Sequence, residues 1–200
     1  MINKLNGWIR KMPAWAIYAA GTTWGAWLFY LGLTGGLGPE PINALERAYG
    51  LVALKLLVVT LAITPLRDWT NLNLTKFRRA IAVTCFFFVL AHFAVWVVLD
   101  VQTLGRVWAD IVKRPYVTIG FAAFLLLLPL AVTSNNLSIR KMGPVRWRKM
   151  HKLMYPAAAL AGLHYVWLVK GWPLQPFVYM ALILALLSLR IRIRNRRVAA

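Results

Sequence analysis

The chain has 200 residues, of which 60% are hydrophobic and only 14% are charged. Soluble domains average roughly 45–50% apolar and 25% charged residues, so this composition excludes an ordinary soluble fold and predicts an integral membrane protein. The formal net charge of +19 does not indicate a nucleic-acid partner, because the basic residues lie in short segments between apolar runs. The length is that of one domain, residues 1–200.

Six apolar segments predict an all-α membrane protein, a bundle of six transmembrane helices. Each spans about 16–20 residues, near the ~20 that a ~30 Å hydrocarbon core requires. The segments are 14–33, 48–65, 80–99, 115–133, 153–169 and 174–189. The first is predicted to be a retained helix and not a cleaved signal. The connecting segments are too short to house a flavin or nucleotide domain.

The distribution of lysine and arginine predicts the orientation. With both termini in the cytosol, the cytosolic segments hold 18 of the 24 basic residues. The opposite side holds five, including Lys170, and one more lies inside a span. Cytosolic loops are enriched in basic residues, so we predict an N-in, C-in topology.

Lys55 is the basic residue that lies inside a span, the second predicted segment. It lies about 10 Å from the predicted outer face. Two interpretations remain open: its ammonium group snorkels to the surface, or it pairs with a haem propionate in the outer half of the membrane.

The third segment contains His92 and the single cysteine, Cys85. One thiol forms neither an internal disulfide nor a cysteine-ligated cluster, so Cys85 is predicted to be a small buried apolar residue. His92 lies 12 residues after Ala80, where the segment leaves the cytosolic side. At the rise of an α-helix this corresponds to ~18 Å of depth.

The fifth segment contains His164, 12 residues after Lys152, and therefore reaches the same ~18 Å. An imidazole inside a bilayer is costly and indicates a function. Two imidazoles at one depth, on helices that both run outward, can ligate a haem iron from both faces. We therefore predict a b-type haem held by His92 and His164. A zinc or copper site would require further protein ligands at that depth, and the sequence offers none there.

His151 opens the fifth segment within WRKMHKLMY. It is either an interfacial histidine among basic residues or the ligand of a second haem, or part of a quinone site, near the cytosolic face. It precedes His164 by 13 residues, ~20 Å along an α-helix, which places the two on nearly opposite faces of an ideal helix, with Pro156 between them as a potential kink.

A basic cytosolic rim is predicted from Arg78, Arg79 and Arg148. Topology and attraction to anionic lipid account for most of this charge. The alternative is that these arginines bind haem propionates, a quinone headgroup or a soluble flavin reductase. The C-terminal RIRIRNRR is predicted to be a solvated, lipid-facing tail.

The residues favour single-electron transfer, with no catalytic residue of the chain's own. Proton relay by the two histidines stays open, although the spans contain no acids to continue the relay. Two rivals also remain: a ferric or cupric reductase acting on external metal, and a non-redox membrane transporter or lipid-binding scaffold.

Several stretches resemble a known family. They are TPLR (64–67), FRRAIAVTCFFFVLAHF (77–93), RPYVTIGFAAFLLLLPLAVTSNN (114–136), WRKMHKLMY (147–155) and AGLHYVWLVK (161–170). They resemble the ferric-reductase-like transmembrane superfamily, and within it the haem-binding membrane subunit of the bacterial periplasmic protein-methionine-sulfoxide reductase system. This superfamily's second haem would need a histidine where the chain has Arg78.

The resemblance implies a multi-pass subunit of the bacterial inner membrane. It implies electrons taken from membrane quinone or a cytosolic flavin donor, and passed through haem to a periplasmic molybdopterin-containing methionine-sulfoxide reductase. FMN is associated with the family, but the chain has no glycine loop of the kind that cradles phosphate.

Overall fold

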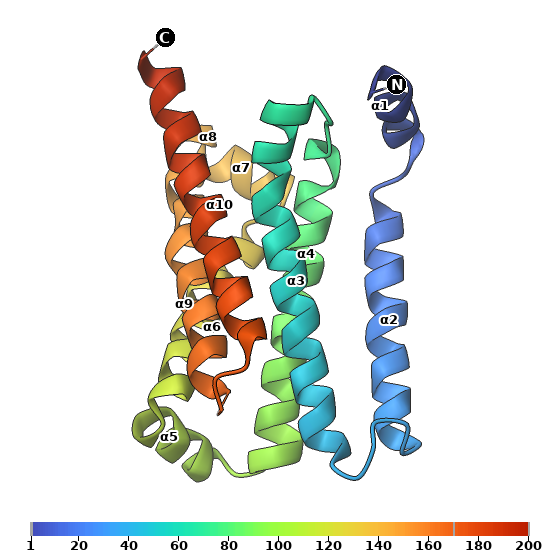
Figure 1. The fold of residues 1–200 in the computed structure, drawn as a ribbon, viewed down its shortest axis with the longest axis vertical. Coiled ribbons are helices and arrows are strands. Elements are labelled where there is room, and N and C mark those ends of the chain that lie inside the picture. Colours follow the sequence, from blue (N-terminus) through green and yellow to red (C-terminus); the bar gives the residue numbers. More distant parts are fainter. Residues whose placement is uncertain (1, 170, 200) are drawn as a thin grey trace. The chain divides into compact units, whose positions relative to one another are not determined.

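The computed structural model describes residues 2–169 and 171–199, with side chains described as far as Arg190. These residues form helices and no strand, which confirms the all-α prediction. Lys170, predicted on the outer side, lies outside the described residues. The chain divides into two compact units, Met1–Gln102 with Leu186–Ala200, and Thr103–Ala185 (Figure 1). That the whole chain forms one domain stays a prediction.

Three stretches among the described residues are long and apolar enough to cross a bilayer. They are Pro41–Thr70, Thr75–Val101 and Pro115–Val132, and they contain the predicted segments 48–65 and 80–99 and nearly all of 115–133. The other three predicted segments are occupied by α2 (Trp15–Leu33), α9 (Met154–Leu168) and the first part of α10 (Leu174–Ala199). A count of six membrane crossings and the N-in, C-in topology stay predictions.

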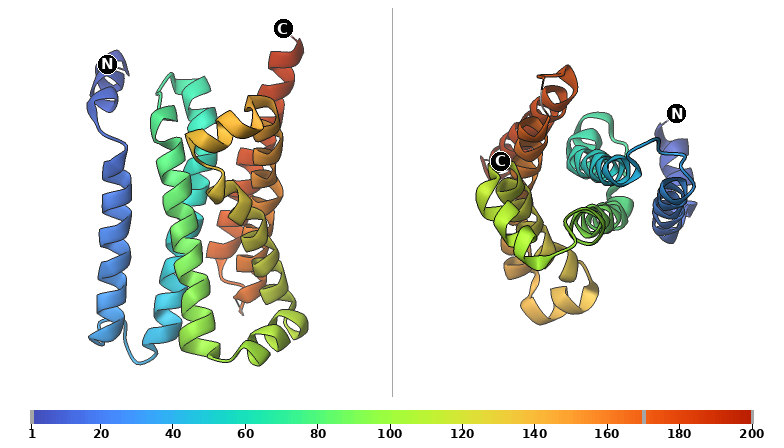
Figure 2. Two further views of the ribbon diagram at one scale, coloured as in Figure 1. Left: turned by 180° about the vertical axis from the view of Figure 1, so that it is seen from behind. Right: turned by 90° about the horizontal axis from the view of Figure 1, so that it is seen from below.

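The first unit is built on two long helical stretches. They are α3 (Pro41–Thr70) and α4 (Arg78–Ala94), the latter preceded by a 3-10 turn η1 (Thr75–Phe77) and continued by η2 (Val95–Val101). Helix α2 packs against both, after the short α1 (Ile2–Lys11) (Figure 2). Leu57, Leu61 and Phe88 are buried in this unit, and Tyr49 Oη donates to the Gly25 carbonyl at 2.9 Å.

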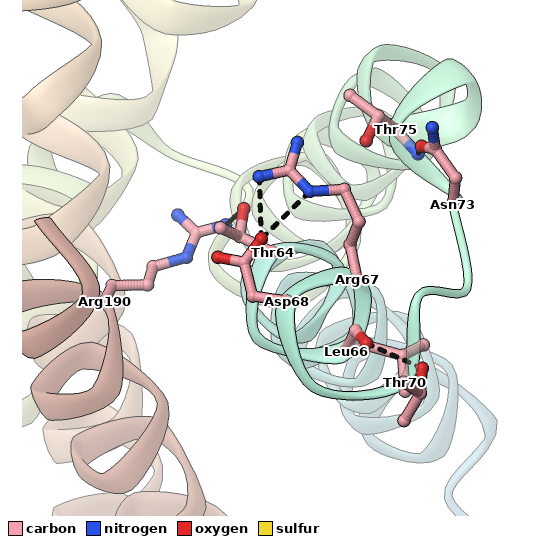
Figure 3. A network of polar contacts seen from close by, with 8 residues as sticks. All are labelled: Thr64, Leu66, Arg67, Asp68, Thr70, Asn73, Thr75 and Arg190. Carbon is pink, nitrogen blue, oxygen red and sulfur yellow. Dashed lines mark hydrogen bonds and ion pairs between the residues drawn. The ribbon is translucent and has the colours of Figure 1, made fainter. Parts of the chain in front are cut away.

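Helix α3 continues through Pro65, although proline removes one hydrogen-bond donor from a helix interior. The carbonyl left without its usual partner is that of Leu61, four residues earlier. Arg190 of α10 supplies the missing donor: its Nε donates to Leu61 O at 3.1 Å and its Nη2 to Thr60 O at 3.1 Å. Nη2 also reaches Thr64 Oγ1 at 3.3 Å (Figure 3).

Arg190 is therefore part of the protein interior, with an exposed fraction of 7%. The prediction of a solvated tail is wrong for this residue, because the proline in α3 creates carbonyls that a guanidinium can satisfy. The side chains after Arg190 lie outside the described residues. Beside this contact, Arg67 and Asp68 form an ion pair of 2.9 Å (Figure 3).

Replacing Arg190 by glutamine should destabilise the protein while Arg146→Gln, at an exposed position of α8 (Pro144–Met150), should not. Buried hydrogen bonds from a charged donor contribute about 1.5–3 kcal/mol, which corresponds to a Tm lower by about 3–12 °C in a chain of this size. Thermal unfolding in detergent measures the difference. Equal Tm values for the two variants would show that Arg190 does not support α3.

The second unit pairs α6 (Pro115–Val132) with α9. Between them lie α7 (Asn136–Met142), α8 and a 3-10 turn η3 (His151–Leu153). Ala157 and Ala158 of α9 are fully buried, and Gly162 faces Met180 and Ile183 of α10. Small residues on α9 thus permit close packing between helices.

An amphipathic helix, α5 (Leu104–Lys113), precedes α6 where the sequence suggested only a loop over 100–114. Leu104, Trp108 and Val112 follow one another at a spacing of four, and all three are exposed. Trp24, Leu128 and many other large apolar side chains of the helices are exposed as well. Apolar surface on this scale is typical of a protein in contact with lipid.

Candidate functional site

His92 lies near the end of α4 and contacts α3. Its Nδ1 donates to the backbone carbonyl of Glu46 at 2.9 Å. The ring lies against Gly50, since a Cβ at that position would lie 3.2 Å from Nδ1 of His92. The imidazole is half-buried between the two helices of the first unit.

His164 of α9 makes the same kind of contact in the second unit. Its Nδ1 donates to the carbonyl of Tyr116 in α6 at 2.7 Å. A Cβ at Gly120 would lie 2.7 Å from Nδ1 and 2.8 Å from Cε1 of this ring. His164 therefore rests directly on the backbone of α6, and more closely than His92 rests on α3.

The two hydrogen bonds assign the proton on each ring. A carbonyl oxygen only accepts, so Nδ1 of His92 and of His164 carries a hydrogen, and in the neutral form of each ring Nε2 is the nitrogen with the lone pair. A histidine that ligates a metal typically donates its other nitrogen to a carbonyl or carboxylate, which fixes the ring and makes it a stronger ligand. Both rings thus make the carbonyl contact that a metal-ligating histidine typically makes.

The backbone changes form immediately after His92. Helix α4 gives way at Val95 to a π-helical segment, η2, which ends at Gln102 with a positive φ of 65°. The N–H of Gln102 donates to the carbonyl of Val97, five residues earlier, at 3.0 Å. π-Helical turns inside α-helices often mark functional sites, and this one lies next to a candidate ligand.

His151 has the opposite arrangement. The hydroxyl of Thr133 donates to Pro129 O at 2.6 Å, so its oxygen accepts from Nε2–H of His151 at 3.1 Å. The ring of Trp147 stacks on His151 with 3.8 Å between centroids. Nε1 of Trp147 donates to Thr133 O at 2.9 Å. His151 and Trp147 thereby cap the end of α6.

His151 also lies in the 3-10 turn η3 and not in α9. The regular-helix spacing assumed from the sequence between His151 and His164 therefore does not hold. Pro156 lies in the first turn of α9, where a backbone N–H has no acceptor within the helix, so the proline removes no hydrogen bond and need not kink α9.

The other predicted site residues lie at the surface of their units. Lys55 is exposed on α3, Arg78 and Arg79 are exposed at the start of α4, and Arg148 is exposed on α8. Their roles stay predictions. Cys85 is buried and its Sγ donates to Ala53 O at 3.2 Å, which confirms that it is an interior residue.

The donor set fits a haem better than a protein-ligated metal ion. Zinc and copper sites take three or more protein ligands, whereas a haem iron takes two. No group of three or more His, Cys, Asp or Glu side chains comes together in the part of the chain that the structure describes. Two imidazoles that each donate Nδ1–H to a carbonyl supply the residue type and the number of protein ligands that a haem iron takes.

Comparison with known proteins identifies the family. Residues 49–162 match the family described as the ferric reductase like transmembrane component, which is 114 of the 200 residues. The chain belongs to the ferric reductase-like transmembrane family. The match to this ferric reductase-like family contains His92 and His151 and ends two residues before His164.

Curated relatives extend the likeness over most of the chain. Over 178 residues this ferric reductase-like chain is 46% identical to proteins from Brucella ovis, Brucella canis and Brucella abortus. Each is named protein-methionine-sulfoxide reductase heme-binding subunit MsrQ, and the alignment covers 88% of this chain and 80% of each relative. No solved structure gave a significant match. The resemblance inferred from local motifs is thus confirmed.

Two features of the site were missed from the sequence. Gly50 and Gly120 lie 42 and 44 residues before the histidines they contact, so no local pattern connects them. The only available signal was a glycine in the interior of an apolar helix, which is costly unless the backbone is closely approached.

Proposed function

We propose that this protein is the haem-bearing membrane subunit of a bacterial methionine-sulfoxide reductase system. The observation that carries the proposal is the shared geometry of His92 and His164, each with Nδ1 donating to a backbone carbonyl, as a histidine that binds iron through Nε2 typically does. The relatives named as heme-binding subunits support it.

Two residues of the chain would hold the group. His92 and His164 would hold one b haem, and the carbonyls of Glu46 and Tyr116 would fix the planes of the two rings. When bound, the haem would supply one-electron transfer between a donor and an acceptor. The chain itself then needs no catalytic residue.

The acceptor we propose is a periplasmic molybdopterin-containing reductase, and the membrane is the bacterial inner membrane. Reducing one sulfoxide to the thioether and water takes two electrons and two protons, so the subunit must deliver two electrons in succession. Membrane quinol or a cytosolic flavin reductase is the proposed donor. Arg78, Arg79 and Arg148 remain candidates for contact with it, and FMN remains a prediction.

The first test is the reduced-minus-oxidised absorption spectrum of the purified wild-type protein with its haem-to-protein ratio. A sharp b-type α band at one haem per chain is expected. A folded, monodisperse protein purified from haem-supplemented cells without any such band would overturn the proposal and favour a non-redox membrane protein.

His151 is proposed to stabilise the end of α6 and not to bind haem. His151→Phe keeps an aromatic ring against Trp147 but removes the hydrogen bond to Thr133. The haem-to-protein ratio should be unchanged, and the stability should fall by about 1 kcal/mol, the contribution of one buried hydrogen bond. Loss of half of the haem in this variant would instead assign a second haem to His151.

Lys55 is proposed to pair with a haem propionate. Lys55→Met keeps the length of the side chain and removes its charge, so it should weaken haem retention or lower the midpoint potential, because the propionate charge that it leaves uncompensated favours ferric over ferrous iron. Redox titration of the purified variant measures this. An unchanged haem content and potential would leave snorkelling as the role of Lys55.

A further inference from the structure

Each candidate haem ligand contacts a backbone carbonyl and a glycine that lie one turn apart in the same helix. Gly50 lies four residues after Glu46 in α3, and Gly120 lies four residues after Tyr116 in α6. In an α-helix residues four apart lie one above the other on the same face. The glycine in each helix is therefore the residue beside the carbonyl that accepts from histidine.

Three threonines elsewhere in the helices, two of them in α3 itself, show what a side chain at that place does. The hydroxyls of Thr60 and Thr70 each donate to the carbonyl four residues earlier, at 2.8 Å and 2.6 Å. Thr34 does the same at 2.9 Å. A side chain four residues on thus lies beside the carbonyl oxygen and blocks or uses it. Glycine leaves that side of the carbonyl open to a donor from another helix.

From this we infer that Gly50 and Gly120 are positioning residues for the two haem-ligating histidines. Without a Cβ, each lets an imidazole lie on the helix backbone and donate Nδ1–H to the carbonyl one turn earlier. The inference rests on the proposed haem function, in which the orientation and basicity of the two rings set the spin state and the potential of the iron.

The two positions should differ in sensitivity. A Cβ at Gly120 would lie 2.7 Å from Nδ1 and 2.8 Å from Cε1 of His164, so the ring must move. A Cβ at Gly50 would lie 3.2 Å from Nδ1 of His92, which a displacement of a few tenths of an ångström relieves. Gly120→Ala should therefore disturb ligation more than Gly50→Ala.

The experiment compares these variants with two alanine controls in the purified holoprotein. Gly162→Ala is equally crowded, at 2.7 Å, but by the flexible end of Met180. Gly25→Ala meets only the ring of Phe88 at 3.7 Å. Electron paramagnetic resonance of the ferric state gives the spin state, and redox titration gives the potential.

Gly120→Ala is expected to lose most of its low-spin signal. Gly50→Ala is expected to stay low-spin with a higher midpoint potential, because a weaker Nδ1–H bond makes the imidazole a poorer donor to ferric iron. Gly50→Ser should shift the potential further, since its hydroxyl competes for Glu46 O. Both controls should match wild type, with helices no less stable for the loss of a glycine.

Unchanged spectra and potentials in both variants, or an equal change in Gly162→Ala, would overturn the inference. If Gly120→Ala does not fold, Gly50→Ala and Gly50→Ser decide it. A wild-type protein without haem would end the proposed function but not this inference. In that case 15N resonances of the histidine rings decide: Nδ1–H tautomers that Gly50→Ala alters support the inference, and unaltered ones overturn it.

Discussion

His92→Gly and His164→Gly are each expected to abolish the low-spin b-type spectrum of the purified protein. A single imidazole holds a haem far less firmly than two, so the haem content should fall to a small fraction of the wild-type ratio. Any haem that remains should be high-spin, because one axial ligand is missing. The absorption spectrum of the reduced protein and electron paramagnetic resonance of the oxidised protein measure both effects.

Added imidazole separates loss of a ligand from loss of the fold. Removing the side chain leaves a space of the ring's size against the Gly50 or Gly120 backbone, and free imidazole can donate to the same carbonyl while binding iron. It should restore the low-spin spectrum in both variants. His151→Gly provides the matched control, with wild-type haem content and no response to imidazole.

A low-spin spectrum that survives in either the His92 or the His164 variant would remove that residue from the ligand set. Should His151→Gly, and not His92→Gly, lose the signal, the haem would belong near the start of α9, and the capping role proposed for His151 would fail with it.

The sequence predicts those parts of the fold that depend on local composition. Long apolar runs identify α3, α4 and α6, because a run of about 20 apolar residues has few alternatives to a buried or membrane helix. His92 and His164 are conspicuous because titratable rings are rare in such runs. The amphipathic α5 was missed although the spacing of Leu104, Trp108 and Val112 carries its signal.

The remaining features depend on contacts between residues far apart in the chain. Nothing near Pro65 in the sequence indicates that a guanidinium 125 residues later replaces its missing donor. The π-helical segment after His92 has an ordinary apolar sequence, VWVVLDV. The acceptors of both histidines are backbone carbonyls, which have no residue type, so only the structure could identify them.

The rate of electron transfer to a partner reductase should depend on His92 and His164 even when the reductase itself is unchanged. In membranes containing this chain and a periplasmic methionine-sulfoxide reductase, quinol or a reduced cytosolic flavin donor should drive methionine-sulfoxide reduction. His92→Gly and His164→Gly should lower that rate by at least about 100-fold, because without the haem no carrier spans the distance between donor and acceptor.

The control is an artificial donor that bypasses the membrane subunit. Reduced viologen supplied from the periplasmic side should support equal rates of sulfoxide reduction with wild type and both variants, since the reductase is unchanged.

The same membranes also distinguish the proposed function from that of a ferric or cupric reductase of the same superfamily. A ferric or cupric reductase would reduce external metal chelates at the wild-type rate when the reductase is absent. The proposed subunit should then show little turnover, because its electrons leave only through a docked protein. Rapid reduction of metal chelates without the partner, together with a rate of sulfoxide reduction that is the same in wild type and in both histidine variants, would assign the chain to the metal-reducing class.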